Sequence, residues 1–437
     1  MIEMEEFRVN REAWKPFLKR WSEEWIAVHG AEPQSAAEEP AAEPRSAVEE
    51  PVTEPPSAVG EPAADGWLGF PPASAEQVEA AEARLGCALP PSFREFLLAT
   101  DGWRWAGKFV DQLRGTGDIG WMRDVDPMWI EIYEEINEDA DEDADEEDEE
   151  EDEEDTDEED EEDEVAVLRR ALLISLEADA GVLFLDPGDV DENGEWAAYE
   201  LFSWRGAGPE RHGSFYELMY DLYAGFHALD RPQCETQREW DTKIEQARLA
   251  SLAGEVDGPL AVFEEAARFG RDRARILLFQ MRAMLGFSDA SQLVRSMLMR
   301  GGKLTWSLDA AFLTAEVLPV LLAEHESTAH WAAHSTLASL AEYGSEPVQR
   351  LVADYRARAG EPGFQARYGD PEFDAAVRAA IAGPADGDPW PLLRGALSTW
   401  RPLSDDHLAP IVLLADPRIA QLITPERGRE ILAMRRG

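Results

Sequence analysis

The sequence has few cysteines, few lysines and no long apolar run. Its two cysteines, Cys87 and Cys234, lie far apart in a chain of 437 residues. This spacing does not suit the disulfide framework of a small secreted protein and predicts a reducing compartment. No apolar run approaches the ~18 residues of a membrane span, and the N-terminal sequence lacks the basic and apolar regions of a signal peptide. These absences predict a cytoplasmic protein. Arginine supplies nearly all basic residues, which is typical of a GC-rich bacterial genome.

Recognisable catalytic motifs are absent as well. The sequence contains neither a glycine-rich phosphate loop nor a Gly-x-Ser-x-Gly nucleophile turn. Glu326, His330 and His334 recur every four residues on a predicted helix, with His325 beside them, and such a face can hold zinc. A polar helix surface explains the same spacing, and no catalytic glutamate lies between the histidines. The sequence therefore predicts no enzyme activity, no cofactor and no bound metal.

Negative charge is abundant, and most of it lies in one segment. The formal net charge is -51, and residues 138–164 hold 24 Asp or Glu in 27 positions. Residues 230–437 carry 29 acidic and 24 basic residues, a net charge of -5. Blocks of like charge are typically disordered, so residues 138–164 are predicted to be a disordered insertion. The field repels nucleic acid and anionic membranes and favours a cationic protein partner.

The first 66 residues combine a helix with a linker. Trp14, Leu18, Trp21 and Trp25 form an aromatic stripe within a predicted helix over 7–29. Prolines then recur with a period of eleven through residues 31–66, a stretch without aromatic residues that predicts a semi-extended linker. Residues 1–30 are expected to belong to the domain that follows this linker.

Three separated motifs in residues 67–229 resemble a known family. "LGCALPPSFREFLLATDGW", "GVLFLDPGDVDENGEWAAYELFSW" and "SFYELMYDLY" occur in the order found in the SUKH superfamily, which contains the Smi/Knr domain. Asp101 stands where asparagine is common in that family. The resemblance implies an α+β fold in which a mixed sheet packs against helices, without enzymatic activity. Many members are immunity proteins that bind and neutralise a bacterial toxin, whereas fungal relatives are signalling scaffolds.

The stretch "DVDENGEWAAYE" within the second motif also matches a calcium loop. Asp189, Asp191, Asn193 and Glu200 would be ligands, and Gly194 would occupy the turn. A calcium-binding loop requires flanking helices, but strand patterns flank this one. Six residues along a strand cover about 20 Å, which is too far for Glu200 to close a coordination shell. A polar hairpin with Asn193 and Gly194 at positive φ is the preferred interpretation.

The loop after the second motif helix supplies candidate partner-binding residues. Aromatic side chains on loops are common interface anchors, and acidic ones suit a basic partner. The candidates in "DGWRWAGKFVDQLRGTGDIGW" are Asp101, Trp103, Trp105, Asp111, Asp118 and Trp121. The alternative for the tryptophans is that one or two of them complete the domain core.

Residues 230–437 show helical patterns throughout. "GPLAVFEEAARFGRDRARILLFQMRAMLGF" predicts two antiparallel helices that join at Phe269 and Gly270. An all-α array is expected, and such arrays bind proteins.

The whole sequence thus predicts a non-catalytic protein-binding module. The preferred function is an immunity protein that covers a toxin with a basic surface, where the acidic run is either a solubilising insertion or a polyanion that steers the encounter. The alternative is a regulatory scaffold whose helical half recruits endogenous partners.

Overall fold

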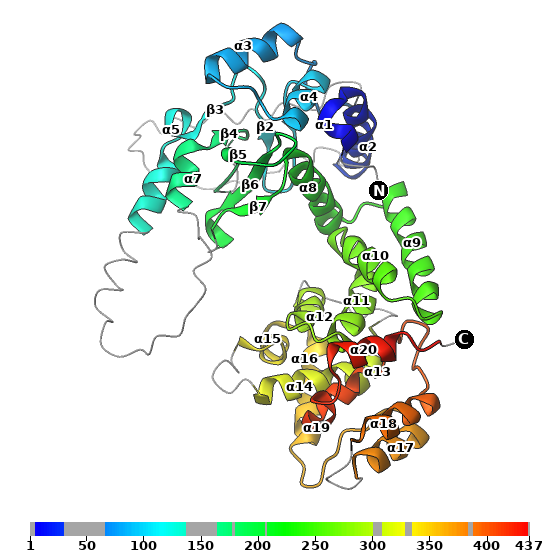
Figure 1. Cartoon of the computed structure of the whole chain (residues 1–437). Coiled ribbons are helices and arrows are strands. Elements are labelled where there is room, and N and C mark those ends of the chain that lie inside the picture. The colour runs from blue at the N-terminus through cyan, green and yellow to red at the C-terminus, as the bar shows by residue number, and fades with distance from the viewer. Residues whose placement is uncertain are drawn as a thin grey trace, which may run out of the picture. The chain divides into compact units, whose positions relative to one another are not determined.

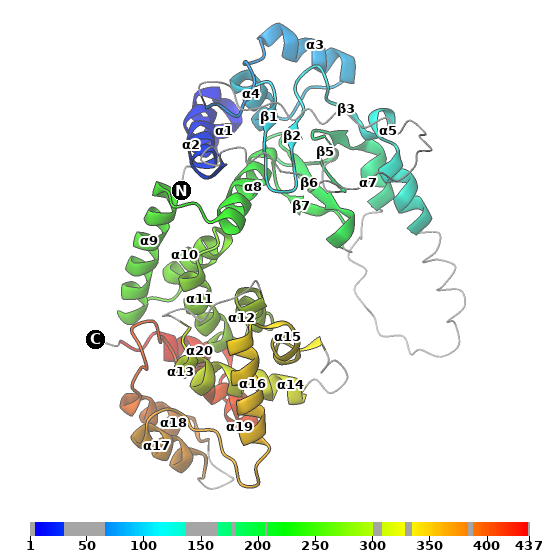
Figure 2. The ribbon, with the colours of Figure 1, turned by 180° about the vertical axis from the view of Figure 1, so that it is seen from behind.

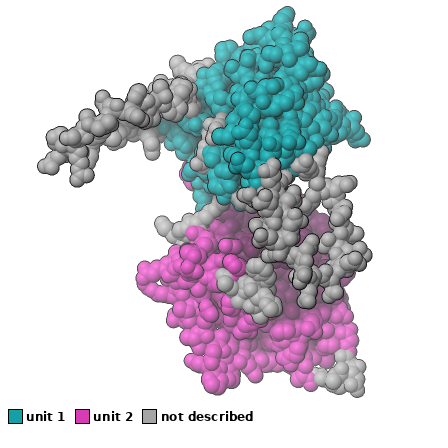
Figure 3. Space-filling model, turned by 90° about the vertical axis from the view of Figure 1, so that its left-hand side faces the viewer, with its two compact units in different colours: residues 1–232 teal, residues 233–437 magenta. Residues whose placement is uncertain are grey.

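A computed structural model describes residues 5–29, 66–136, 164–176, 180–205, 208–299, 308–327, 334–382 and 388–435. The chain divides into two compact units, Met1–Pro232 and Gln233–Gly437, shown in separate colours in Figure 3. The predicted linker and the predicted acidic insertion lie outside the described residues, except for Gly66 and Glu164. In the part of the chain that is described, no helix has both the length and the apolar character needed to cross a membrane.

A five-stranded sheet forms the centre of the first unit. Its strands, in spatial order, are β3 (Gly120–Trp121), β4 (Leu172–Leu173), β5 (Gly181–Val190), β6 (Trp196–Phe202) and β7 (Glu210–His212). A separate pair consists of β1 (Trp103–Arg104) and β2 (Gln112–Leu113). The resemblance implied a mixed sheet, whereas all the pairings among the described strands are antiparallel. The longest pairing joins β5 to β6 and places Phe184 opposite Tyr199.

Helices cover both faces of this sheet. The helices of the first unit are α1 (Glu5–Val9), α2 (Arg11–His29), α3 (Ala75–Leu85), α4 (Pro91–Ala99), α5 (Met122–Val125), a helix over 128–136, α7 (Glu164–Arg170) and α8 (Phe215–Asp230). Figures 1 and 2 show α7 and α8 on opposite sides of the strands. Every residue of β6 is buried, because both faces of the strand are covered. The expected α+β fold is confirmed.

Local signals explain where several of these helices begin. The Ser74 side chain accepts a hydrogen bond from the Gln77 backbone, and the reciprocal Gln77 bond completes a capping box at the start of α3. The Ser214 side chain caps α8 by accepting from the Glu217 backbone, whereas the Glu217 side chain accepts from the Gly213 backbone. The predicted single helix over 7–29 is interrupted at Asn10, whose Oδ1 accepts a hydrogen bond from the Glu12 backbone, 2.9 Å away. Asparagine competes with the helix by this kind of local bond.

The N-terminal helices pack into the first unit. Trp14 on α2 is fully buried, and its ring contacts Phe7, Phe96 and Phe215 at centroid distances of 5.2, 5.3 and 5.7 Å. Residues of α1, α2, α4 and α8 thereby share one aromatic core. The opposite face of the sheet has its own core, in which Phe184 stacks on Tyr199 at 5.2 Å beneath the helix over 128–136 and α7.

The described part of the second unit is helical and contains no strand. Its α-helices are α9 (Glu235–Leu252), α10 (Asp257–Arg268), α11 (Asp272–Met284), α12 (Ala290–Met299), α13 (Ala310–Phe312), α14 (Leu318–Ser327), α15 (Thr336–Tyr343), α16 (Glu346–Ala359), α17 (Pro371–Ile381), α18 (Trp390–Ala396), α19 (Pro417–Ala420) and α20 (Pro425–Leu432). α10 and α11 pack together and join at the predicted residues, with Gly270 at a φ of 72°. α20 returns to α11, and a Cβ on Gly428 would lie 1.7 Å from the Met284 carbonyl oxygen. This close approach requires glycine.

Candidate partner-binding surface

The loop over 105–111 connects β1 and β2 and begins with a strained residue. Trp105 has a φ of 55°, which is rare for a bulky side chain. Its backbone N–H donates to the Asp111 carbonyl, 2.5 Å away. The Trp105 ring stacks on Trp25 of α2 with a centroid distance of 5.4 Å. The strain is thus held in place by a hydrogen bond and a ring contact, as is common for loops that position a surface.

The structure separates the candidate residues into buried and accessible ones. Trp103 is fully buried and contacts Trp21 and Trp67 at 5.7 and 5.3 Å. Trp103 completes the core, as the alternative interpretation held. Its side chain is not accessible to a partner in this conformation. Asp101 holds the next loop together, because its carboxylate accepts hydrogen bonds from the Thr116 backbone and hydroxyl at 2.6 and 3.0 Å.

The remaining candidates lie at or near the surface. Asp118 is exposed, whereas Trp105, Asp111 and Trp121 are partly buried. The Trp121 indole donates to the Leu85 carbonyl at the end of α3, 3.3 Å away. Trp105 thus packs on α2 and Trp121 bonds to the end of α3, so these two tryptophans lie against different helices.

An aromatic cluster that sequence reasoning missed lies where the 105–111 loop meets the end of β6. We call it the Trp204 patch, and it consists of Phe109, Phe202, Trp204 and Arg205. Trp204 is 52% exposed and lies 5.3 Å from Phe109 and 5.4 Å from Phe202, between ring centroids. The Arg205 guanidinium lies over the Phe202 and Trp204 rings at 4.9 and 5.6 Å. Tryptophan and arginine are the residue types that dominate interface hot spots.

Two carboxylates, those of Glu200 and Glu210, bind the Arg205 guanidinium of this patch. Arg205 Nη1 donates to Glu200 at 2.7 Å and to Glu210 at 2.6 Å. Burial raises the pKa of Glu200 to about 7, and the bond from Arg205 opposes that rise. Glu200, Glu210, His212 and Asp221 also offer four possible metal-ligand atoms within 4.8 Å of one another. Arg205 already supplies positive charge to two of these carboxylates, those of Glu200 and Glu210. The role of the acidic cluster is therefore to fix the position of Arg205.

Replacing Glu200 by glutamine is expected to flatten the pH dependence of stability. Because the folded-state pKa of about 7 exceeds the ordinary 4.5, the folded protein binds more protons than the unfolded chain between these values. Wild-type stability should therefore fall as the pH rises through this window, by up to about 3 kcal/mol. Over the same pH window the free energy of unfolding of the Glu200→Gln variant should fall much less. Urea unfolding at several pH values measures both proteins.

Glu192→Gln is the matched control, because Glu192 is an exposed carboxylate at the hairpin tip. This variant should follow the wild-type pH profile. An unchanged profile in Glu200→Gln would show that Glu200 ionises normally in the folded protein.

The calcium-like stretch forms a hairpin between β5 and β6. The Asp191 carboxylate accepts hydrogen bonds from the Asn193 and Glu195 backbones, each at 2.8 Å. Gly194 has a φ of 80°, whereas Asn193 does not have the expected positive φ. Asp189 pairs with Arg211 at 2.6 Å. The carboxylates of Asp189 and Asp191 thus accept hydrogen bonds from protein groups in β7 and in the hairpin turn, and helices do not flank the hairpin.

The predicted histidine face is only partly described. His330 lies outside the described residues. His325 Nδ1 lies 2.7 Å from the Ser335 hydroxyl, and Glu326 is exposed. Of the described residues of this face, His325 thus makes a polar contact with a neighbouring helix cap, Ser335.

Residues 72–222 match the model of the SMI1 / KNR4 family (SUKH-1). Searches of curated proteins and of solved structures found no match to the chain. The matched region runs from just before α3 into α8 and includes the sheet and the 105–111 loop. The family supports an immunity or regulatory role in protein binding and is generally not enzymatic. The chain therefore contains a SUKH-1 domain, to which an additional helical unit is joined on the C-terminal side.

Proposed function

We propose that this protein is an immunity protein that neutralises a toxin by binding it through the Trp204 patch. The observation that carries the proposal is the half-exposed Trp204, at 52%, within the SUKH-1 domain. Tryptophan is among the residue types most enriched at interface hot spots, and here it lies beside the partly exposed Phe109 and the exposed Arg205. The role is inhibition by contact, as in family members that neutralise toxins.

The surroundings of the patch suit a basic partner. Glu210 has an exposed carboxylate, 57% accessible, next to Arg205. Asp111 closes the loop that carries Phe109, and residues 138–164 add strong negative charge to the same chain. Such a field increases the rate of encounter with a cationic toxin, which then falls as salt is raised. Trp105, Asp118 and Trp121 are proposed as peripheral contacts.

A regulatory scaffold is the second candidate function. A groove in the second unit, whose lining includes Arg401 and Leu403, favours it, since an immunity protein that acts through its SUKH-1 domain has no evident need for a second binding site. In that case endogenous partners would depend on residues 230–437.

Capture from the native host with the full chain, followed by co-expression with the captured toxin, tests the proposal. The wild-type chain should restore growth, and Trp204→Ala should fail to do so at matched expression. Truncating a hot-spot tryptophan costs about 2–3 kcal/mol, so the affinity for the toxin should fall about 100-fold.

Val190→Ala is the matched control, since Val190 is 48% exposed on the same sheet but outside the patch. It should protect as well as the wild type. Full protection by Trp204→Ala would remove the patch from the interface. Capture of several cellular proteins without a toxin would favour the scaffold.

A further inference from the structure

The second unit contains a groove with a volume of about 1280 Å³. Its walls come from the end of α9, from α18, from the segment 397–405 and from the end of α20 with the residues that follow. All of these residues belong to the second unit. The groove is formed by segments that are distant in sequence, and α9 approaches the C-terminal segment closely, because a Cβ on Gly254 would lie 2.6 Å from the Ala433 carbonyl oxygen.

The groove carries more positive than negative charge. Its lining includes Arg248, Arg394, Arg401 and Arg435 but only the carboxylates of Asp405 and Glu430. This excess contrasts with residues 230–437 as a whole, which have 29 acidic and 24 basic residues. Positive charge is thus concentrated in the groove of an acidic unit.

Two of these arginines have no carboxylate partner within the described chain. Arg248 pairs with Glu245, and Arg394 pairs with Glu430. Arg401, by contrast, donates only to backbone carbonyls, with Trp400 O at 3.0 Å as the shorter contact. Arg435 forms no ion pair with a described residue. Both side chains are exposed and can receive carboxylates from outside.

Apolar side chains lie beside these cations. Leu403 lines the groove and is 50% exposed. Leu252 and Met434 line it as well and are partly exposed. An occupant can therefore bury an apolar side chain against this wall while its carboxylates reach Arg401 and Arg435.

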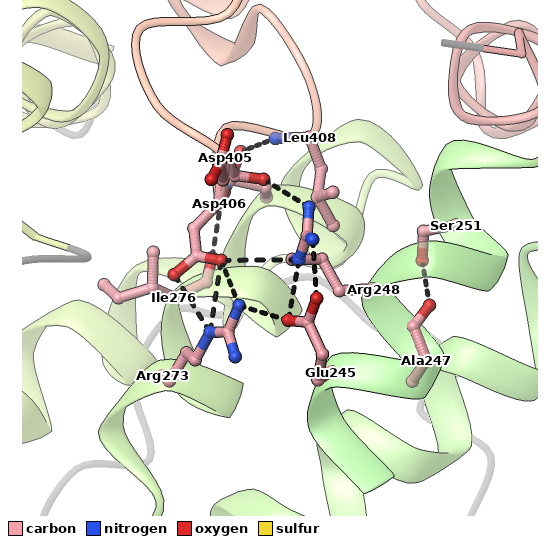
Figure 4. A network of polar contacts seen from close by, with 10 residues as sticks. Glu245, Ala247, Arg248, Ser251, Arg273, Ile276, Asp405, Asp406 and Leu408 are labelled. Atoms are coloured by element: carbon pink, nitrogen blue, oxygen red, sulfur yellow. Dashed lines mark hydrogen bonds and ion pairs between the residues drawn. The ribbon is translucent and has the colours of Figure 1, made fainter. Parts of the chain in front are cut away.

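Buried polar contacts of Asp406 and His407 fix the segment that carries Arg401 and Leu403. Asp406 is fully buried as a side chain and pairs with Arg273 at 2.9 Å, which Figure 4 shows together with the contacts of Arg248 and Glu245. His407 is also buried; its Nδ1 accepts from the Leu403 backbone at 3.0 Å. Its Nε2 lies 2.9 Å from the Ala409 carbonyl, so Nε2 carries the proton. An anchored wall loses little conformational entropy on binding.

We infer that this groove binds an acidic peptide segment of a partner protein, in which carboxylates flank an apolar side chain such as leucine. The unpaired Arg401 and Arg435 recognise the carboxylates, and Leu403 receives the apolar side chain. This site is independent of the Trp204 patch and of the proposed toxin binding.

The chemistry of the groove distinguishes this occupant from other polyanions. Residues 138–164 supply carboxylates but contain no apolar side chain larger than alanine, so they lack the group that Leu403 would receive. The aromatic rings Trp390 and Trp400 line the groove but are only 8% and 7% exposed. They offer little surface for the base stacking on which single-stranded nucleic acid binding depends.

A peptide array probed with the full-length protein tests the inference. One set of short peptides carries two glutamates and one leucine at varied spacings. Matched sets replace glutamate by lysine or leucine by serine, and one further peptide has the sequence of residues 138–164. Binding is expected only in the glutamate–leucine set. In solution, fluorescence anisotropy with the strongest peptide should show affinity about 30-fold weaker for the Arg401→Glu, Arg435→Glu double variant.

The double variant Arg238→Glu, Arg367→Glu is the matched control. Both are exposed arginines of the second unit that do not line the groove, and the change in net charge is the same. It should bind as the wild type does. Binding that survives charge reversal of Arg401 and Arg435, or no binding in the glutamate–leucine set, would overturn the inference.

Two further outcomes would assign the groove to another occupant. Equal or tighter binding of the 138–164 peptide would indicate a charge-only site for a second copy of this chain. Tighter binding of an oligonucleotide of matched charge, lost in the Arg401, Arg435 variant, would indicate nucleic acid. Protection of cells against the toxin is measured in a separate assay, so that the two proposals can fail independently. Trp204→Ala should bind the peptides as the wild type does. The Arg401→Glu, Arg435→Glu variant should still protect cells against the toxin.

Discussion

Replacing Trp14 by alanine is expected to destabilise the first unit by about 4 kcal/mol, since removal of a buried tryptophan costs about 3–5 kcal/mol. Trp14 has no exposed surface, and it contacts rings from α1, α4 and α8. Its indole also donates to the Phe7 carbonyl at 3.2 Å. The substitution leaves a cavity at the point where the N-terminal helices meet the rest of the domain.

Hydrogen exchange followed by mass spectrometry measures this effect unit by unit. Peptides from α4 and α8 should lose protection in Trp14→Ala, whereas peptides from the second unit should not change. Val9→Ala is the control, because Val9 is 77% exposed on the neighbouring helix. If α4 and α8 kept wild-type protection in Trp14→Ala, the N-terminal helices would not be part of the cooperative domain.

Replacing Asp406 by alanine should destabilise the second unit by about 3–4 kcal/mol, within the range for breaking a buried ion pair. The Asp406 side chain is fully buried and lies 2.9 Å from Arg273 and 3.9 Å from Arg248. Without it, Arg248 and Arg273 would keep their pairs with Glu245, whose side chain is 41% exposed. The bonds from Arg248 hold the pKa of Glu245 at about 2, so Glu245 stays ionised but is partly solvated.

Asp405→Ala is a close control for this experiment. Asp405 precedes Asp406 but has an exposed side chain, and its contact with Arg248 is made by the backbone carbonyl at 3.0 Å. Urea unfolding of the full chain, with exchange of α9 and α11 as the local readout, should separate the two variants. A loss below about 1 kcal/mol in Asp406→Ala would be typical of exposed pairs and would show that Asp406 is not needed to neutralise the two arginines.

The sequence was most informative where structure depends on neighbouring residues. The junction at Gly270 was predicted because it depends on a backbone angle set within a few residues. The hairpin interpretation of the calcium-like stretch succeeded for the same reason. The family resemblance added the fold class, which local patterns alone do not specify.

Binding surfaces were harder to predict because they depend on long-range contacts. Trp103 begins β1 and Trp204 lies two residues after β6, yet one is fully buried and the other is 52% exposed. The difference arises from Trp21, which covers Trp103 from a helix about eighty residues earlier. The Trp204 patch likewise depends on Phe109 reaching the end of β6. No sequence spacing encodes either contact.

The packing of α2 against α8 also affects how the chain folds during synthesis. Tyr223 on α8 donates to Glu24 on α2 at 2.5 Å, across a sequence separation of 199 residues. At typical translation rates the ribosome needs about 10–40 s to add that many residues. The aromatic stripe of α2 therefore stays unpacked until α8 has been synthesised. During this interval, residues 11–29 would be a binding site for a chaperone that shields apolar helices.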